Sequence, residues 1–296
     1  MGYGNYSHEA HVRISKGRSK GSRGKVFKQT KCHPAMNPYG VKFRESRDSA
    51  DHPNSTPVIF ALDVSGSMGE IPGHMAAKTL PTFMKTLDDA GVPDPQVLFM
   101  AIGQGTHDRA PLQIGQFEST AELMDQWLTR MYLEGRGGGG NESYELGMYF
   151  AARHTSCDSW EKRQEKGFFF VTGDEPPNPL VLKREVKGLL GDDLDEDIPL
   201  ASMMKELRES WHPFFLIPDL GRGRSQGPAW RGVFGDNCIV CATPDDVGYV
   251  AAGLVALTVG ARLETVLARF EKTGLPADRL PGLRSAMAGY AKSIGQ

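Results

Sequence analysis

The chain has 296 residues, of which 40% are hydrophobic, and its 34 basic and 36 acidic side chains leave a formal net charge of −2. These values are typical of a folded globular protein and exclude a bulk charge bias toward nucleic acid or acidic surfaces. Apolar stretches are strand-length or broken by charge, so we expect no membrane span. Four scattered cysteines are too few for a disulfide framework, and residues 1–20 lack an apolar signal core. We therefore expect a cytoplasmic protein.

Residues 1–56 differ in composition from the rest and are expected to form an N-terminal arm. Residues 16–25 are basic, rich in Gly and Ser, and without apolar periodicity, which is typical of a solvated, flexible tail. A basic arm could contact phosphates, but this one is short and lacks interleaved aromatic side chains for base stacking. We expect an arm that is only partly flexible, because Tyr39 to Phe43 could lie against the domain.

From residue 57 onward, short apolar runs alternate with segments of helical periodicity. Strands are expected at 58–63, 96–102, 112–117, 167–172, 213–217 and 238–242, and helices at 74–90, 120–133, 142–154 and 245–257. Pro81 predicts a kink or a late start in the first of these helices. Strands separated by helices indicate βαβ units, and hence an α/β fold with a mostly parallel sheet.

The main domain is expected to span residues 57–260, with two insertions and a C-terminal helical extension at 261–296. The first insertion, 176–210, reads as two short helices joined by an acidic, solvated loop. The second, 219–236, carries three arginines among glycines and is expected to be a long loop between strands.

The most informative motif is Asp63-Val-Ser65-Gly-Ser67, at the end of the first expected strand. A carboxylate and two hydroxyls at alternate positions just past a strand converge on one small volume. Such oxygens suit a hard divalent cation, Mg²⁺ in particular, or alternatively Mn²⁺ or Ca²⁺. Magnesium sites usually keep waters or borrow a ligand from elsewhere, so an incomplete shell can accept a carboxylate from another molecule.

Two further segments place polar side chains at the same edge of the expected sheet. The first, Gly135 to Gly147, is a glycine run that leads through Asn141-Glu142-Ser143 into a helix. Its alternative interpretation is a helix N-terminus capped by Asn141. The second places Asp174 and Glu175 directly after a buried aromatic strand, where the alternative is an acidic turn before two prolines. Open α/β sheets favour a ligand crevice at the carboxyl ends of their strands.

Asp63, Ser65 and Ser67 match residue for residue the Asp-x-Ser-x-Ser motif of the metal-ion-dependent adhesion site (MIDAS) of von Willebrand factor A domains. The chain resembles the bacterial, intracellular members of this family. The resemblance implies a doubly wound, mostly parallel sheet with helices on both faces and one antiparallel edge strand. The family's second metal loop usually supplies a threonine, and here the position points to Glu142, with Asn141 and Ser143 in reach.

The third metal loop of the family reads Thr-Asp-Gly, whereas this chain has Thr-Gly-Asp, so that Asp174 lies one place late and Glu175 is a possible substitute. The resemblance implies that Mg²⁺ is held by Asp63, Ser65 and Ser67, with the two later loops completing the shell. An acidic side chain of a protein partner then takes the open position. If Glu142 coordinates, its extra negative charge should tighten metal binding and weaken the attraction for an acidic partner.

The resemblance thus implies a non-catalytic interaction module. Many bacterial relatives work alongside AAA+ ATPases, which makes that class the first partner to test, and we expect neither a membrane nor a nucleic-acid partner. One alternative is a metal-dependent hydrolase, in which Glu142 or Glu175 assists a metal-bound water, although no general base with a second metal is evident. The other is a nucleic-acid-associated protein that uses the basic arm and the arginines of residues 219–231.

Overall fold

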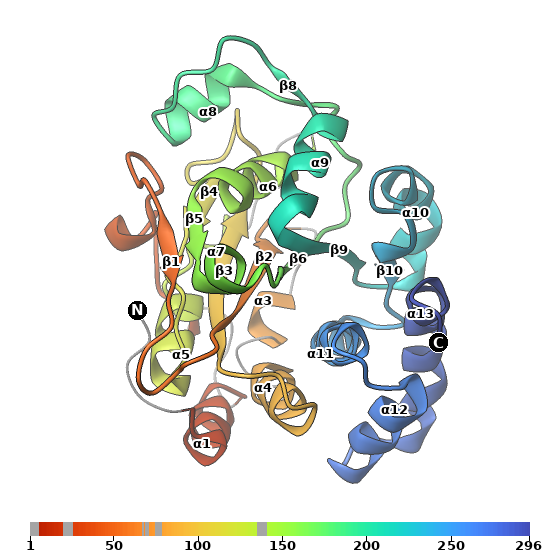
Figure 1. Ribbon diagram of the computed structural model, residues 1–296. Helices are drawn as coiled ribbons and strands as arrows, with labels where there is room; N and C mark the ends of the chain where they lie inside the picture. The colour runs from red at the N-terminus through yellow and green to blue at the C-terminus, as the bar shows by residue number, and fades with distance from the viewer. Residues whose placement is uncertain (1–5, 20–25, 67, 69–70, 75–78, 135–140) are drawn as a thin grey trace.

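A six-stranded sheet lies at the centre of the computed structural model, which describes residues 6–19, 26–66, 68, 71–74, 79–134 and 141–296 (Figure 1). Within these residues the strands follow one another across the sheet as β10 (Cys238–Val240), β9 (Trp211–Ile217), β6 (Gly167–Thr172), β2 (Thr56–Asp63), β3 (Pro95–Ile102) and β4 (Leu112–Ile114). Neighbouring strands are parallel, except that β4 runs antiparallel to β3. Strands counted along the chain therefore lie in the doubly wound order 3-2-1-4-5-6. The predicted fold class, with its antiparallel edge strand, is confirmed.

Helices cover both faces of this sheet, and the alternation of side chains along each strand decides which helices a residue meets. On one face lie α4 (Leu80–Asp89), α5 (Ala121–Thr129), α11 (Val247–Thr258), α12 (Leu263–Lys272) and α13 (Leu280–Ser293). On the other lie α6 (Tyr144–Arg153), α9 (Leu200–Ser210) and α10 (Leu220–Phe234), while α8 (Lys183–Leu189) stands beyond the edge of the sheet (Figure 1). Phe60 of β2 stacks between Phe99 and Phe170 on the first face, while its neighbour Ile59 faces the second.

Burial on both faces explains why β2 and β6 are continuous apolar runs in the sequence. The helix expected at 74–90 is observed as α3 (Ile71–His74) and α4, and residues 75–78 lie outside the described residues. Pro81 stands in the first turn of α4, which is the late start predicted for it. Among the helices that the structure describes, none is both long and apolar enough to cross a membrane.

The prediction of a loop at residues 219–236 is wrong, because most of this segment forms α10. Its glycines and Pro228 lower the intrinsic helix propensity, which is why the sequence reads as a loop. The side chain of Asp219 caps the helix by accepting from the N–H of Arg222 at 3.0 Å. The buried Trp230 stacks on Phe215 of β9 with ring centroids 3.7 Å apart. Tertiary packing and this cap therefore override the local preference.

Part of the N-terminal arm is helical and docked, including residues 16–19 of the stretch that was expected to be flexible. Helix α1 (His8–Ser19) packs against α4 and α5, with His11 buried, and Arg18 contacts Asp125 of α5 at 2.7 Å. Residues 20–25, the remainder of the basic stretch, lie outside the described residues. Farther along, a 3₁₀ turn (Pro34–Met36) precedes β1 (Arg44–Ser46), which pairs in parallel with β5 (Thr155–Cys157) as a separate two-stranded sheet.

The region between β6 and β9 carries α8 and α9, and between them lies an acidic segment. A short antiparallel pair joins the two ends of the segment that contains α8, namely β7 (Leu180–Val181) and β8 (Ile198–Pro199). In Figure 1, α8 and the segment that joins it to β8 stand above α6 and α9.

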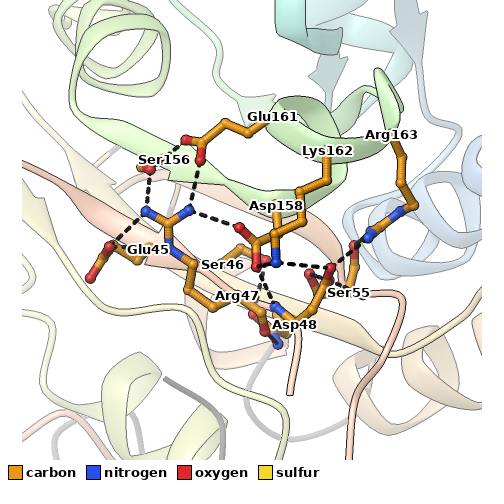
Figure 2. Close-up of polar contacts among 11 residues, drawn as sticks. Glu45, Ser46, Arg47, Asp48, Ser55, Ser156, Asp158, Glu161, Lys162 and Arg163 are labelled. Carbon is orange, nitrogen blue, oxygen red and sulfur yellow. Dashed lines mark hydrogen bonds and ion pairs between the residues drawn. The ribbon is translucent and has the colours of Figure 1, made fainter. Parts of the chain in front are cut away.

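Arg47 is the centre of a polar network that ties the segment after β1 to α7 (Asp158–Arg163) (Figure 2). Its guanidinium donates to Asp158 at 2.9 Å, to Glu161 at 2.8 Å and to Ser156 at 2.5 Å. The side chain of Asp158 is only 6% exposed, so the charge of Arg47 compensates a carboxylate that water barely reaches. This network fixes the chain just before it enters β2.

We expect Arg47→Ala to lower the free energy of unfolding by roughly 1–3 kcal/mol, because it leaves a buried carboxylate with fewer donors. Urea denaturation monitored by circular dichroism measures this change. Arg284→Ala is the matched control, since Arg284 pairs with Glu264 at an exposed position, where solvent screens the pair, and it should cost clearly less than Arg47→Ala. Equal costs for the two variants would contradict the role given to Arg47.

Candidate metal centre

Three carboxylates meet at the carboxyl edge of the sheet, where the strand order reverses between β2 and β6. Asp63 ends β2, Asp174 follows β6, and Glu142 precedes α6. One carboxylate oxygen of each residue lies within 4.8 Å of the other two, and all three side chains are buried. The structure thus brings together one acidic residue from each of the three loops singled out in the sequence, at the position where doubly wound sheets bind ligands.

The loop after β2 is held by Asp63 itself. Its Oδ1 accepts from the backbone N–H of Ser65 at 2.8 Å, and the Ser65 hydroxyl also hydrogen-bonds this carboxylate. Ser65 is buried beside Asp63 and can offer a hydroxyl oxygen to the same volume. Ser67, the third ligand implied by the motif, lies outside the described residues, as does the glycine run 135–140.

Tyr144, a residue that we did not identify from the sequence, connects all three loops. Its hydroxyl donates to Asp63 Oδ2 at 2.7 Å and accepts from the backbone N–H groups of Asp174 at 3.2 Å and Glu175 at 3.3 Å. A Cβ on Gly173 would lie 2.5 Å from the Tyr144 hydroxyl, so glycine is required for this close approach. The aromatic residue directly after Asn141-Glu142-Ser143 was the available signal in the sequence.

The carboxylates of the centre repel one another in a site with little water. Burial, together with the charges of Asp63, Glu175 and Asp174, raises the pKa of Glu142 to about 8. Burial likewise raises the pKa of Asp63 to about 7, although hydrogen bonds from Ser65 and Tyr144 oppose this. Glu142 Oε2 is buried and has no hydrogen-bond partner among the described residues. These groups fit a bound cation, which would offset the repulsion and fill the vacant coordination of that oxygen.

One basic side chain already contacts the cluster. Arg222, from the first turn of α10, donates through Nε to Asp174 Oδ2 at 2.8 Å and through Nη1 to Asp219 Oδ2 at 2.5 Å. Its side chain is one-third exposed, so it borders both the carboxylates and the solvent. The sequence had marked this arginine only as part of a loop, because α10 was not recognised.

Among the acidic candidates of the two later loops, Glu142 and Asp174 join the carboxylate cluster, whereas Glu175 does not. Asn141 and Ser143 line a neighbouring cavity. Coordination by Asp63, Ser65, Ser67, Asn141, Glu142 or Asp174 stays a prediction.

Neither a protein-family model nor a curated protein matches this sequence. Similar solved structures include the pilus adhesin SpaC from Lactobacillus rhamnosus GG, with 13% identity and a TM-score of 0.45 over 72% of this chain and 31% of that one. Proximal thread matrix protein 1 from the mussel byssus has 12% identity and a TM-score of 0.42, over 67% of this chain and 46% of its own. Another structure of that mussel protein has a zinc-occupied MIDAS motif.

A von Willebrand factor type A protein from Catenulispora acidiphila has 12% identity and a TM-score of 0.39, over 78% of this chain and 52% of its own. The structural neighbours thus include von Willebrand factor A proteins, as the resemblance of the Asp63 motif implied. The chain spans about a third to a half of the length of these three proteins. The roles of its residues rest on its own topology and geometry.

The stability of the ion-free chain should fall as the pH rises, because Glu142 is protonated in the folded state. Its folded pKa of about 8 exceeds the value of about 4.3 for glutamate in an unfolded chain. The folded state therefore binds the extra proton between these values, and the free energy of unfolding decreases as the pH rises through that window. Glu142→Gln should remove this loss and be more stable than the unaltered chain at pH 9, by at least about 1.4 kcal/mol.

Urea denaturation in a chelating buffer at pH 4 and pH 9 measures this difference, which should vanish at the lower pH. Mg²⁺ should reduce it at pH 9 by stabilising the unaltered chain. Glu209→Gln serves as the control, because Glu209 is exposed on α9 and lies outside the cluster. A stability difference that is the same at both pH values would show that Glu142 is not held protonated.

Tyr144→Phe should weaken metal binding by about 10–100-fold, because it removes the hydroxyl that orients Asp63 and satisfies two backbone donors of the third loop. Isothermal titration with Mg²⁺ measures the affinity. Tyr149→Phe is a matched control, since its hydroxyl hydrogen-bonds Asp192 instead. Unchanged affinity in Tyr144→Phe would mean that the three loops are held together without this hydroxyl.

Proposed function

We propose that this chain is a non-catalytic, metal-dependent protein–protein interaction module. Its divalent cation, Mg²⁺ or else Mn²⁺ or Ca²⁺, is held by Asp63 and Ser65 with Ser67, by Glu142 or Asn141 from the second loop, and by Asp174 from the third. The observation that carries this proposal is the convergence of three buried carboxylates from separate loops at the switch point of the sheet, one with an unpartnered oxygen.

The charges of the centre favour an acidic group on the partner. A divalent ion would offset most of the negative charge of the three carboxylates, and Arg222 adds a positive charge that it shares between Asp174 and Asp219. Arg222 therefore reduces, without cancelling, the expected weakening by Glu142 of the attraction for an acidic partner. Arg222 is partly exposed and could also donate to that carboxylate, a charge-assisted hydrogen bond of the stronger kind.

The finer parts of the proposal rest on the resemblance alone. A bacterial AAA+ ATPase is the partner class to test first, and the cytoplasm is the expected compartment.

Asp63→Ala should weaken Mg²⁺ binding by more than about 100-fold while the thermal unfolding curve stays cooperative, because Asp63 is the central ligand. Isothermal titration measures binding, and Asp278→Ala, at an exposed acidic position, is the control. Capture of an AAA+ ATPase by the immobilised chain should be lost with Asp63→Ala and with EDTA alike.

Three results would count against the proposal. Capture that survives both EDTA and Asp63→Ala would show a metal-independent interface. Wild-type Mg²⁺ affinity in Asp63→Ala would remove the metal centre. Phosphoester turnover that requires Mn²⁺ and Asp63 would show a hydrolase instead of an interaction module.

A further inference from the structure

A second polar cavity lies beside the metal centre, on the other side of residues 142 and 143. It has a volume of about 240 Å³. Its walls come from the segment after β3, from the start of α6, and from the segment that leads into α8, and they include Gln104, Ser143, Glu145, Asn178 and Glu185. The proposed function makes no use of this cavity.

Two carboxylates from different helices line this cavity. Glu145 of α6 is 2% exposed and Glu185 of α8 is 9% exposed. The Glu145 carboxylate accepts from its own backbone N–H and from the amide of Asn178, which lies 3.2 Å from both carboxylate oxygens. Burial, with a smaller contribution from the charge of Glu185, raises the pKa of Glu145 to about 8. Two acidic groups in one small cavity need a positive charge or protons.

Arg184, a basic side chain that lines this cavity, compensates the negative charge of Glu145 and Glu185 only in part. Arg184 lowers the pKa of Glu185, but burial outweighs that effect and Asp197 opposes it. Arg184 is exposed, so water screens its charge, and no ion pair between it and either carboxylate occurs among the described residues.

Two residues that line this cavity carry buried acceptor atoms without hydrogen-bond partners among the described residues. Glu185 Oε2 and Gln104 Oε1 are both buried and have no hydrogen-bond partner in the described part of the chain. A Cβ on Gly105 would lie 2.7 Å from Glu185 Oε2 and 2.9 Å from the Ser143 hydroxyl oxygen, so these oxygens converge beside Gly105. The Ser143 hydroxyl accepts from the N–H of Gly105 at 3.0 Å. Unpartnered buried acceptors of this kind call for a donor or a cation.

We infer that this cavity is a second divalent-cation site, in which the carboxylates of Glu145 and Glu185 and the amide oxygen of Gln104 hold a hard ion, Ca²⁺ by preference. All of these donors are oxygens, and two carboxylates balance the charge of one divalent ion. Ca²⁺ accepts mixed carboxylate, amide and hydroxyl oxygens in an irregular shell and leaves room for water. A water occupies about 30 Å³ in the liquid, so the cavity has space for the ion and several waters.

The second site shares a wall with the metal centre but none of its three clustered carboxylates. Asn178 connects the two, because its amide donates to the backbone carbonyl of Glu142 at 3.2 Å as well as to Glu145. The backbone N–H of Ser143 donates to the carbonyl of Gly103 at 3.0 Å. A cation here would therefore brace the loop that presents Glu142.

The test counts bound Ca²⁺ by isothermal titration of the full chain after chelation and dialysis. The unaltered chain should bind two ions, and Glu185→Gln and Asp63→Ala should each bind one. Glu209→Gln, at an exposed position on α9, is the control and should bind two. If Glu185→Gln binds as many ions as the unaltered chain, the second site is overturned.

Failure of the metal centre gives a different result, in which the unaltered chain binds one ion that Asp63→Ala retains and Glu185→Gln loses. Gly105→Ala provides a second variant with all carboxylates intact, because its methyl group would occupy the space between Glu185 and Ser143. It should lower the affinity of one site by at least 10-fold and leave the other unchanged. Thermal unfolding of each variant confirms that it is folded, and two unchanged sites in Gly105→Ala would contradict the inference.

Discussion

Electrostatic repulsion between Asp63, Glu142 and Asp174 is the constraint around which the carboxyl edge of the sheet is organised. Each side chain is buried, so water cannot screen the three charges as it would at the surface. The chain partly compensates with the Tyr144 hydroxyl on Asp63 and with Arg222 on Asp174. Among the described residues Glu142 Oε2 has no hydrogen-bond partner, so the arrangement is favourable only when a proton or a cation is present.

The sheet could be predicted from the sequence because its strands are buried on both faces. Runs such as 58–62 and 167–171 are apolar throughout, and helical periodicity separates them, so their type and order followed directly. The three acidic loops could also be located, since each follows a recognisable pattern. What could not be predicted depends on distant contacts. Helix α10 forms despite its glycines because Trp230 packs on Phe215, and α1 docks through contacts with α4 and α5.

Within the site, too, some residues could be identified from the local sequence, whereas others act only through distant contacts. The carboxylates of Asp63 and Asp174 were identified because they end strands, whereas Tyr144 and Arg222 act through contacts across 81 and 48 positions of the chain. No local pattern encodes such pairs. Arg222 in particular depends on α10, so the error in the helix prediction concealed the countercharge of the site. Tertiary structure thus supplied the electrostatic balance that the motif alone did not reveal.

Because Tyr144 packs against Gly173, the Asp-x-Ser-x-Ser motif cannot be moved to another protein by itself. The phenol occupies the space that any side chain at position 173 would require. If the first loop alone is grafted onto another α/β scaffold, the graft contains the metal ligands of that loop but lacks Tyr144, which sets the spacing between the loops. The portable unit is therefore the acidic loop, the tyrosine that begins the helix, and the glycine that makes room for it, although these come from three separate stretches of chain.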